Sequence, residues 1–460
     1  MSRETVAPRD IARPFVRGAL LYFVVIGVLG AWLRARFAGL FPLPFLREAN
    51  VIHAHSHVAF FGWANFAVFA AMYSILPRLT GRPLAAVRQI RWQLALTHVA
   101  TVGALVTFAM GGYWPPSIVF SSVNGVVWYM FVWIYWKNTA GLPRPLPVAL
   151  RYLHAAVALL VLCSLGTWLV AGLTASGADL PLLESAALHL FLNNFIDGWV
   201  LVGLLGLVTF VLSAPAAPAG SASAAVRAAS AADGWAAKPL PWLAALTPIS
   251  FLADVIPAGL PAFWAVVGVG ARTALAVPYV MFLRGARRRL AELAGGAAAS
   301  RPAPGAAPGR AAGGPAVLDA PARALLIAAG LFFAGKAVAH GLSFVAAVAP
   351  SHQLFIAHIH LSLLGFFSVG VLGVLWHLAA DRGPAPGRDS PAGVLGPWVL
   401  AAGVAGMVLT LFGAAGADVL LEGAARARGV TRLLEAAFAF AVVSVAGIPA
   451  VGVPLVRRWR

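Results

Sequence analysis

The 460-residue sequence has a single cysteine, Cys163, and few charged residues. One cysteine excludes an intrachain disulfide, a cluster of thiolate metal ligands and the Cys-x-x-Cys-His attachment of c-type haem. Charged residues make up only 10% of the chain and hydrophobic residues 61%, and the apolar residues form long blocks. A soluble domain shows short amphipathic periods instead. The composition therefore predicts an all-α, polytopic membrane protein.

Twelve apolar runs are each long enough, at about 20 residues, to cross a bilayer as a helix. We expect them to form a single transmembrane domain over residues 1–460, with the first run an uncleaved span because no small-residue cleavage site follows it. Two Ala/Pro/Gly/Ser-rich stretches, 214–238 and 285–320, are predicted to be flexible cytoplasmic loops. The expected spans are 15–34, 51–76, 91–113, 117–136, 150–173, 184–213, 240–257, 260–283, 321–347, 353–379, 394–415 and 432–456.

Acidic residues are also scarce: 15 against 33 lysines and arginines, a net charge of +18. Such a charge can indicate a nucleic-acid partner, but here the arginines fall mostly in alternate loops, which is how membrane topology is encoded. The pattern favours a lipid bilayer over nucleic acid as the partner. It predicts a multi-pass protein of the cell inner membrane with both termini cytoplasmic. The predicted inner-loop cations are Arg78, Arg82, Arg88, Lys137, Arg144, Arg151, Arg284, Arg287, Arg288, Arg289, Arg457, Arg458 and Arg460.

Two histidine clusters interrupt the second and tenth apolar runs: His53, His55, His57, His358 and His360. An ionisable side chain at membrane depth is costly, so these imidazoles need a reason beyond packing, and a metal or haem iron is the most economical one. The second, sixth and tenth spans all run from outside to inside. Their histidines, with His189 at the start of the sixth span, are therefore expected to gather in the outer half of the membrane.

Helix geometry divides these histidines between different faces. Successive residues turn by about 100°, so His358 and His360 point to opposite sides of the tenth span. A bis-histidine haem needs one imidazole from each of two facing helices, which His55 and His360 can provide, leaving His358 for a second iron. Gly62, with Phe66 and later aromatics, is expected to continue the His55 face as a flat surface for a porphyrin. Imidazole also suits zinc and copper, so the spacing leaves the metal open.

Other histidines have alternative interpretations. His53 or His57 can replace His55 as the ligand or hold a haem propionate, and His189 is a further alternative ligand. A single histidine in a membrane helix is more often a hydrogen-bonding group to a neighbouring helix. This is expected for three isolated residues: His98, His154 and His377.

At these residues the sequence resembles subunit I of the haem-copper oxidase superfamily, closest to its C-family (cbb-type) cytochrome c oxidases and the related nitric oxide reductases. Segment 352–365 resembles the family's signature in the tenth span, and segment 55–78 resembles the one that carries the other low-spin haem ligand. The resemblance implies low-spin haem b on His55 and His360 and a high-spin haem on His358. It also implies a membrane oxidoreductase of respiration and electron transport that acts on O2 or NO, with a cytochrome or cupredoxin subunit as electron donor.

The departure from that family concerns its second metal. The family holds copper or iron on one histidine of the sixth span and an adjacent pair of the seventh. The seventh span here, 240–257, has no histidine, and the sixth has Asn193 or Asn194 at the ligand position. No intact copper site is therefore expected, and the sequence leaves the catalytic residues unknown. Two other classes stay open: a non-catalytic haem-binding protein of nitric-oxide response, sensing or assembly, and a transporter or channel without haem.

Five more polar residues are predicted at membrane depth, where none should face lipid. Lys336 and His340 lie one turn apart on the ninth span and can form part of a proton path. Asp254 and Arg272 can instead form a structural ion pair between neighbouring spans, and Asp197 lies in the sixth span. The sequence alone leaves both interpretations open.

Overall fold

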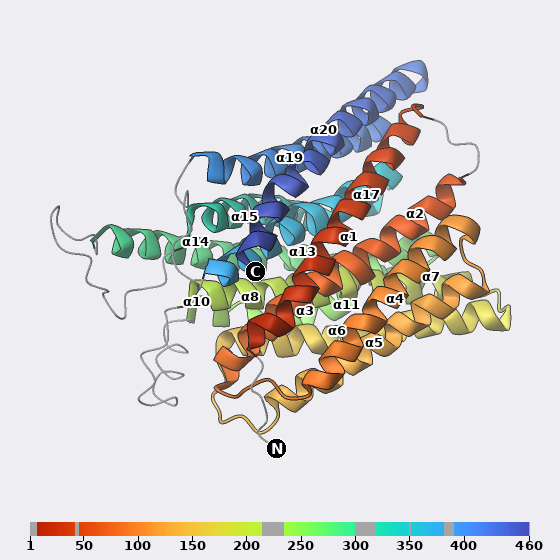
Figure 1. Cartoon of the computed structure of the whole chain (residues 1–460). Helices are drawn as coiled ribbons and strands as arrows, with labels where there is room; N and C mark the ends of the chain where they lie inside the picture. Colours follow the sequence, from red (N-terminus) through yellow and green to blue (C-terminus); the bar gives the residue numbers. More distant parts are fainter. Residues whose placement is uncertain are drawn as a thin grey trace.

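The computed structural model describes residues 7–41, 46–213, 234–299, 318–348, 351–380 and 391–459. Within these ranges the chain is helical and contains no strand. Twelve helices are long and apolar enough to cross a membrane, and they lie side by side in one bundle (Figure 1). The predicted all-α, multi-pass membrane fold is confirmed.

The twelve spans fall into three groups of four. The first group is α1 (Pro8–Phe37), then α2 (Glu48–His57), η1 (Val58–Ala64) and α3 (Asn65–Thr80) as one span, then α4 (Val87–Gly111) and α5 (Pro115–Thr139). The second group is α6 (Val148–Ser176), then α7 (Pro181–Asn193), η2 (Asn194–Val202) and α8 (Gly203–Leu212), then α10 (Gly234–Ala237), α11 (Leu240–Ser250), α12 (Leu252–Val255) and η3 (Ile256–Ala258), and finally α13 (Ala262–Ala274) with α14 (Ala276–Ala299). The third group is α15 (Ala320–Gly341) with the short α16 (Ser343–Val348), then α17 (His352–His360), η4 (Leu361–Ser368) and α18 (Val369–Ala379), then α19 (Pro391–Leu420) and α20 (Gly423–Arg458).

The predicted cytoplasmic loops lie largely at positions that the structure does not describe. Residues 214–233 and 300–317 are outside the described ranges. The second loop also begins later than expected, because α14 continues through the arginine-rich segment to Ala299. Alanine, leucine and arginine all have high helix propensity, so the helix continues beyond the apolar run that defined the expected span.

The packing of the helices repeats every four spans. The second, sixth and tenth spans meet at the centre through α3, α8 and α18. Their apolar windows are 89%, 94% and 78% buried, whereas no other span exceeds 56%. Each central span packs between the span before it and the span after it, and α5, α14 and α20 close the ring against α6, α15 and α1. The bundle thus has three similar sectors around three central spans.

Each central span also changes from α-helix to π-helix at the same place. The three π-helical segments, η1, η2 and η4, each begin four residues before a glycine that is followed by an aromatic residue: Gly62, Gly198 and Gly365. The residue just before each π segment is His57, Asn193 or His360, and two residues earlier stand His55, Phe191 and His358. Because π-helical turns are rare and frequent at functional sites, this shared position marks the level of the candidate site.

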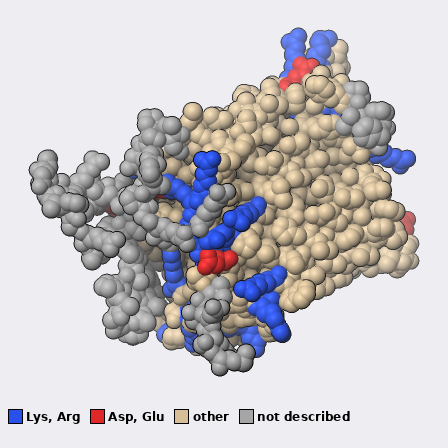
Figure 2. Space-filling view, viewed as in Figure 1, with Lys and Arg blue, Asp and Glu red and all other residues tan. Residues whose placement is uncertain are grey.

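The two chain ends lie on the same side of the bundle, as an even number of spans requires. The guanidinium of Arg9 stacks over the Trp459 ring at 5.2 Å and donates to the Arg458 carbonyl. Many of the visible lysines and arginines lie toward this side, and a broad uncharged surface separates them from the few at the opposite end (Figure 2). That distribution suits helices that cross a bilayer.

Candidate functional site

His55 of α2 and His360 of α17 lie within electrostatic range of each other and of the buried Arg34 near the end of α1. His360 Nδ1 donates to the Ile356 carbonyl at 2.8 Å, which leaves its Nε2 as a free lone pair. His55 Nδ1 is buried and makes no hydrogen bond within the described residues. Two helices therefore offer one imidazole each to this region of the bundle.

The surroundings of this histidine pair are shaped by small and aromatic residues. A Cβ added to Gly30 of α1 would lie 3.1 Å from His55 Cε1, so glycine gives the imidazole its room. Further along the same spans, the Phe23 ring stacks on Trp63 with centroids 4.1 Å apart. The Trp63 Nε1 donates to Ser368 Oγ at 2.7 Å. These contacts join the first, second and tenth spans beneath the two histidines.

The prediction that Gly62 and Phe66 form an open, flat surface below His55 is wrong. A Cβ on Gly62 would meet Tyr22 at 2.7 Å and Thr101 at 2.8 Å, so that face already packs against α1 and α4. Phe66 packs on Tyr22 and His98, with ring centroids 5.3 and 4.7 Å apart. The expected stripe assumed regular α-helix, and the π-helical η1 between His55 and Phe66 changes the face that later residues occupy.

His53 and His57 share a face turned away from His55, as the helical period predicted. Both rings contact Tyr113, and the His57 ring stacks on Phe108 with centroids 3.9 Å apart. His57 Nδ1 donates to the His53 carbonyl at 2.8 Å. These two histidines therefore pack among aromatic residues of α4 and the loop after it, on a different side of α2 from the pair with His360.

Two of the isolated histidines are bridges between helices, as predicted. His98 Nδ1 lies 2.8 Å from the Tyr22 hydroxyl, and His154 Nδ1 lies 2.6 Å from the Tyr135 hydroxyl. Each pair joins two different spans.

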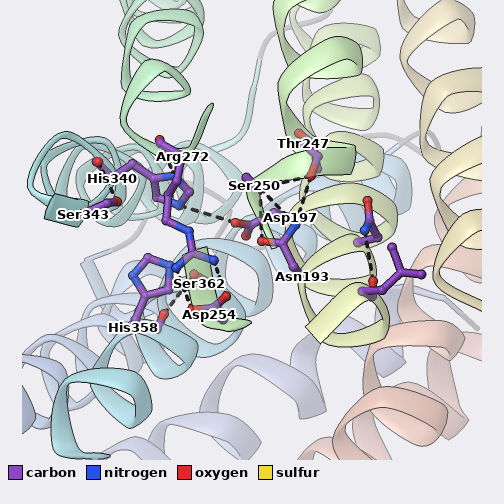
Figure 3. Close-up of polar contacts among 12 residues, drawn as sticks. Asn193, Asp197, Thr247, Ser250, Asp254, Arg272, His340, Ser343, His358 and Ser362 are labelled. Atoms are coloured by element: carbon purple, nitrogen blue, oxygen red, sulfur yellow. Dashed lines mark hydrogen bonds and ion pairs between the residues drawn. The ribbon is translucent and has the colours of Figure 1, made fainter. Parts of the chain in front are cut away.

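His358 points to the opposite side of the tenth span from His360, as predicted, into a buried ionic group that we call the Asp197 cluster. It consists of Asp197, Lys336, His340 and His358 (Figure 3 shows three of them). The Lys336 ammonium lies 2.8 Å from Asp197 Oδ1 and 3.3 Å from His358 Nε2, and donates to Ser362 Oγ at 2.7 Å. His340 Nε2 lies 3.4 Å from Asp197 Oδ2. The Lys336 and His340 side chains are fully buried.

An ion pair lies beside the Asp197 cluster. Arg272 Nη1 donates to Asp254 Oδ1 at 2.7 Å, so the predicted pairing of these two residues is confirmed. The Arg272 carbonyl accepts from His340 Nδ1 at 3.2 Å, which connects the pair to the cluster. His189 interacts electrostatically with both members of the pair and its ring lies 6.3 Å from that of Phe355. When the histidines are neutral, the charges of Asp197 and Asp254 balance those of Lys336 and Arg272, so the ion pair and the Asp197 cluster together carry no net charge.

Asn193, rather than Asn194, points from the sixth span toward the seventh. Its amide donates to the Thr247 carbonyl at 3.1 Å and to Ser250 Oγ at 3.0 Å. Asn194 instead donates to Leu190 of its own helix at 3.0 Å. The position that carries a histidine in the other two central spans therefore carries an amide here, and it faces hydroxyl and carbonyl oxygens.

Each sector lies between two of the central spans: the first between spans two and ten, the second between spans two and six, and the third between spans six and ten. The three sectors differ in the ligands that they offer a haem iron. In the first, His55 and His360 provide two imidazoles and a nearby cation. In the second, span six has Phe191 at the position where spans two and ten have His55 and His358, so His57 has no second imidazole opposite it. The Trp128 and Phe195 rings lie against Phe191. A porphyrin needs open space in front of its ligand nitrogen, but in the third sector Lys336 lies in front of His358. The first sector therefore offers the two imidazole ligands that a bis-histidine haem needs, whereas at His358 the Lys336 ammonium occupies the place in front of the ligand nitrogen.

Two residues of these sites were not identified from the sequence: the arginine beside the histidine pair and the acid of the buried ionic cluster. Arg34 was not singled out, because one arginine at the end of an apolar run looks like any loop cation. Asp197 was noted without a partner, because the sequence does not show which other spans pack against the sixth.

A scan against protein-family models found no family that matches this chain, and a search of curated proteins found no match. The fold and the site thus define a twelve-span, all-α membrane protein with a paired-histidine site and a separate buried ionic cluster.

Proposed function

We propose that the protein is a membrane haem b protein that carries electrons through one haem held between His55 and His360. The observation that supports this most directly is that an imidazole from span two and one from span ten lie within electrostatic range of each other and of one buried arginine. The resemblance of both segments to haem-copper oxidase subunit I points to the same ligands. The cell inner membrane is the proposed location, and a cytochrome or cupredoxin subunit the proposed donor.

The chain's own residues would hold the haem in three ways. His360 keeps its Nε2 free because Nδ1 is bound to the Ile356 carbonyl, and such a second hydrogen bond also fixes the ring's direction. Arg34 is only 6% exposed, its guanidinium lies over the Phe37 ring at 5.0 Å, and no salt bridge to it occurs among the described residues, so it would pair with a haem propionate. The stacked Phe23 and Trp63 rings exclude water from the side facing the bundle. When bound, haem b supplies one-electron redox chemistry.

We propose one haem rather than two. Transfer to a second haem on His358, and binding of O2 or NO there, would require space that Lys336, Asp197 and His340 fill. An iron with two imidazole ligands has no open position for a gas. The proposed protein is therefore closer to the non-catalytic haem-binding class than to a terminal oxidase or nitric oxide reductase.

Haem content of purified variants tests the ligand assignment. His55→Ala and His360→Ala are expected to lose the low-spin haem spectrum, because each removes one of the two iron ligands. His57→Ala is the matched control: it is two residues from His55 on the same helix but faces Phe108. It should keep the haem. Retention of a low-spin bis-histidine spectrum in either of the first two variants, or its loss only in the control, would refute the assignment.

A further inference from the structure

The Asp197 cluster contains the donor atoms of a metal site that is separate from the proposed haem. One carboxylate oxygen of Asp197 and one ring nitrogen each of His340 and His358 all lie within 4.8 Å of one another. The buried Asp197 Oδ1 is paired with the Lys336 ammonium at 2.8 Å, and the buried His340 Nε2 makes no hydrogen bond of ordinary geometry within the described residues. Two imidazoles and a carboxylate that converge on one point are a typical donor set for a divalent transition metal.

The directions of the histidines suit this use. His340 donates from Nδ1 to the Arg272 carbonyl at 3.2 Å, so its Nε2 is the nitrogen that points toward Asp197. A carbonyl bound to the second ring nitrogen is the usual support of a metal-bound histidine. His358 directs its Nε2 toward the same centre. The three donors come from the sixth, ninth and tenth spans, so helix packing fixes their relative positions.

The Lys336 ammonium lies against two of these three donors. Its nitrogen lies 2.8 Å from Asp197 and 3.3 Å from His358. Zinc bonds to nitrogen and oxygen are shorter, about 2.0–2.2 Å, so donors around an ammonium stand farther apart than donors around a metal. The Lys336 ammonium beside these donors explains why their ligand atoms stand up to 4.8 Å apart. A metal cation and the lysine cation compete for the place because like charges repel.

We propose that Asp197, His340 and His358 form a site for a divalent transition metal such as Zn²⁺ or Fe²⁺, and that Lys336 fills it with its own ammonium when no metal is bound. The lysine provides the positive charge that the buried Asp197 requires, and it keeps metal affinity low. The imidazole-rich donor set selects against Mg²⁺ and Ca²⁺, which prefer oxygen ligands. This inference does not depend on the haem proposal, because His360 points to the other side of the tenth span.

Equilibrium Zn²⁺ binding to the purified full-length protein tests the proposal. The wild-type chain is expected to bind one Zn²⁺ weakly, and Lys336→Met, which removes the competing charge, is expected to bind it at least tenfold more tightly. Lys336→Met combined with His340→Ala, or with Asp197→Asn, removes a ligand and should lose that gain. His154→Ala, a bridge between other helices, should leave Zn²⁺ affinity unchanged.

Thermal unfolding of the same variants keeps the test decisive if Lys336→Met is unstable. A saturating concentration of Zn²⁺ should raise the melting temperature of Lys336→Met, because the metal takes over the charge that balances Asp197. It should not stabilise the variant that combines Lys336→Met with Asp197→Asn. The proposal is overturned if Lys336→Met binds Zn²⁺ no more tightly than wild type, if the gain survives removal of His340, or if Lys336→Met stays unfolded with Zn²⁺ present.

Discussion

The pair of Lys336 and Asp197 gives the sharpest prediction about stability. Their side chains are 0% and 5% exposed, and Lys336 Nζ lies 2.8 Å from Asp197 Oδ1. Lys336→Met removes the cation and keeps most of the side-chain length, which leaves a buried carboxylate with only His340 at 3.4 Å. An unpaired buried charge typically costs about 3–5 kcal/mol of unfolding free energy. We expect a loss of that size when a chelator keeps metal out of the site.

The double variant Asp197→Asn with Lys336→Met separates the charge effect from the loss of packing. It removes both charges and preserves both shapes, and neutral replacements of buried pairs are often close to neutral in stability. Its unfolding free energy should therefore return to within about 1 kcal/mol of wild type. The contrast between single and double variants measures the cost of the unpaired carboxylate.

The assay is denaturant unfolding in detergent micelles, followed by loss of helical circular dichroism. The control is Asp10→Asn in the exposed pair with Arg13, whose side chains are 50% and 26% exposed. It should change stability by less than about 0.5 kcal/mol, because exposed pairs contribute little. The Lys336 ammonium does not stabilise the buried Asp197 carboxylate if Lys336→Met lowers the unfolding free energy by less than about 1 kcal/mol, or if the double variant is as unstable as the single one.

Three further variants probe the surroundings of the histidine pair. Gly30→Leu places side-chain atoms where a Cβ alone is 3.1 Å from His55, so haem affinity should fall about tenfold or more; unchanged haem content would contradict this. Arg34→Gln should lower the haem reduction potential by an amount on the order of tens of millivolts, because removing a buried positive charge stabilises the oxidised iron. A redox titration that shows no shift or a rise would count against it. Ser368→Ala leaves the Trp63 indole N–H without its acceptor and should cost about 1–2 kcal/mol in unfolding experiments, whereas a neutral effect would show that this contact is dispensable.

The sequence predicted the twelve spans well because lipid imposes a simple rule of length and polarity. All twelve expected runs overlap the observed spans. The helical period also predicted that His358 and His360 face opposite sides, and that His53 and His57 turn away from His55. These inferences succeeded because they involve residues within one regular α-helical turn or two.

The prediction failed where the helix is not regular. The π-helical η1 begins one residue after His57, so the face that continues below His55 could not be extrapolated to Gly62 and Phe66. The partners across the bundle were equally out of reach. Lys336 and Asp197 are far apart in the chain, and only packing of the sixth span against the ninth and tenth brings them to 2.8 Å. Nothing in the local sequence of either residue encodes that contact.

In the proposed protein, one haem iron is held by two imidazoles and has no open position. The haem-to-protein ratio of the purified chain, with its reduced spectrum recorded before and after addition of carbon monoxide, tests this arrangement. One haem b per chain and a spectrum that carbon monoxide leaves unchanged are predicted. Absence of haem, or two haems of which one binds carbon monoxide, would show that the iron is not held in this way.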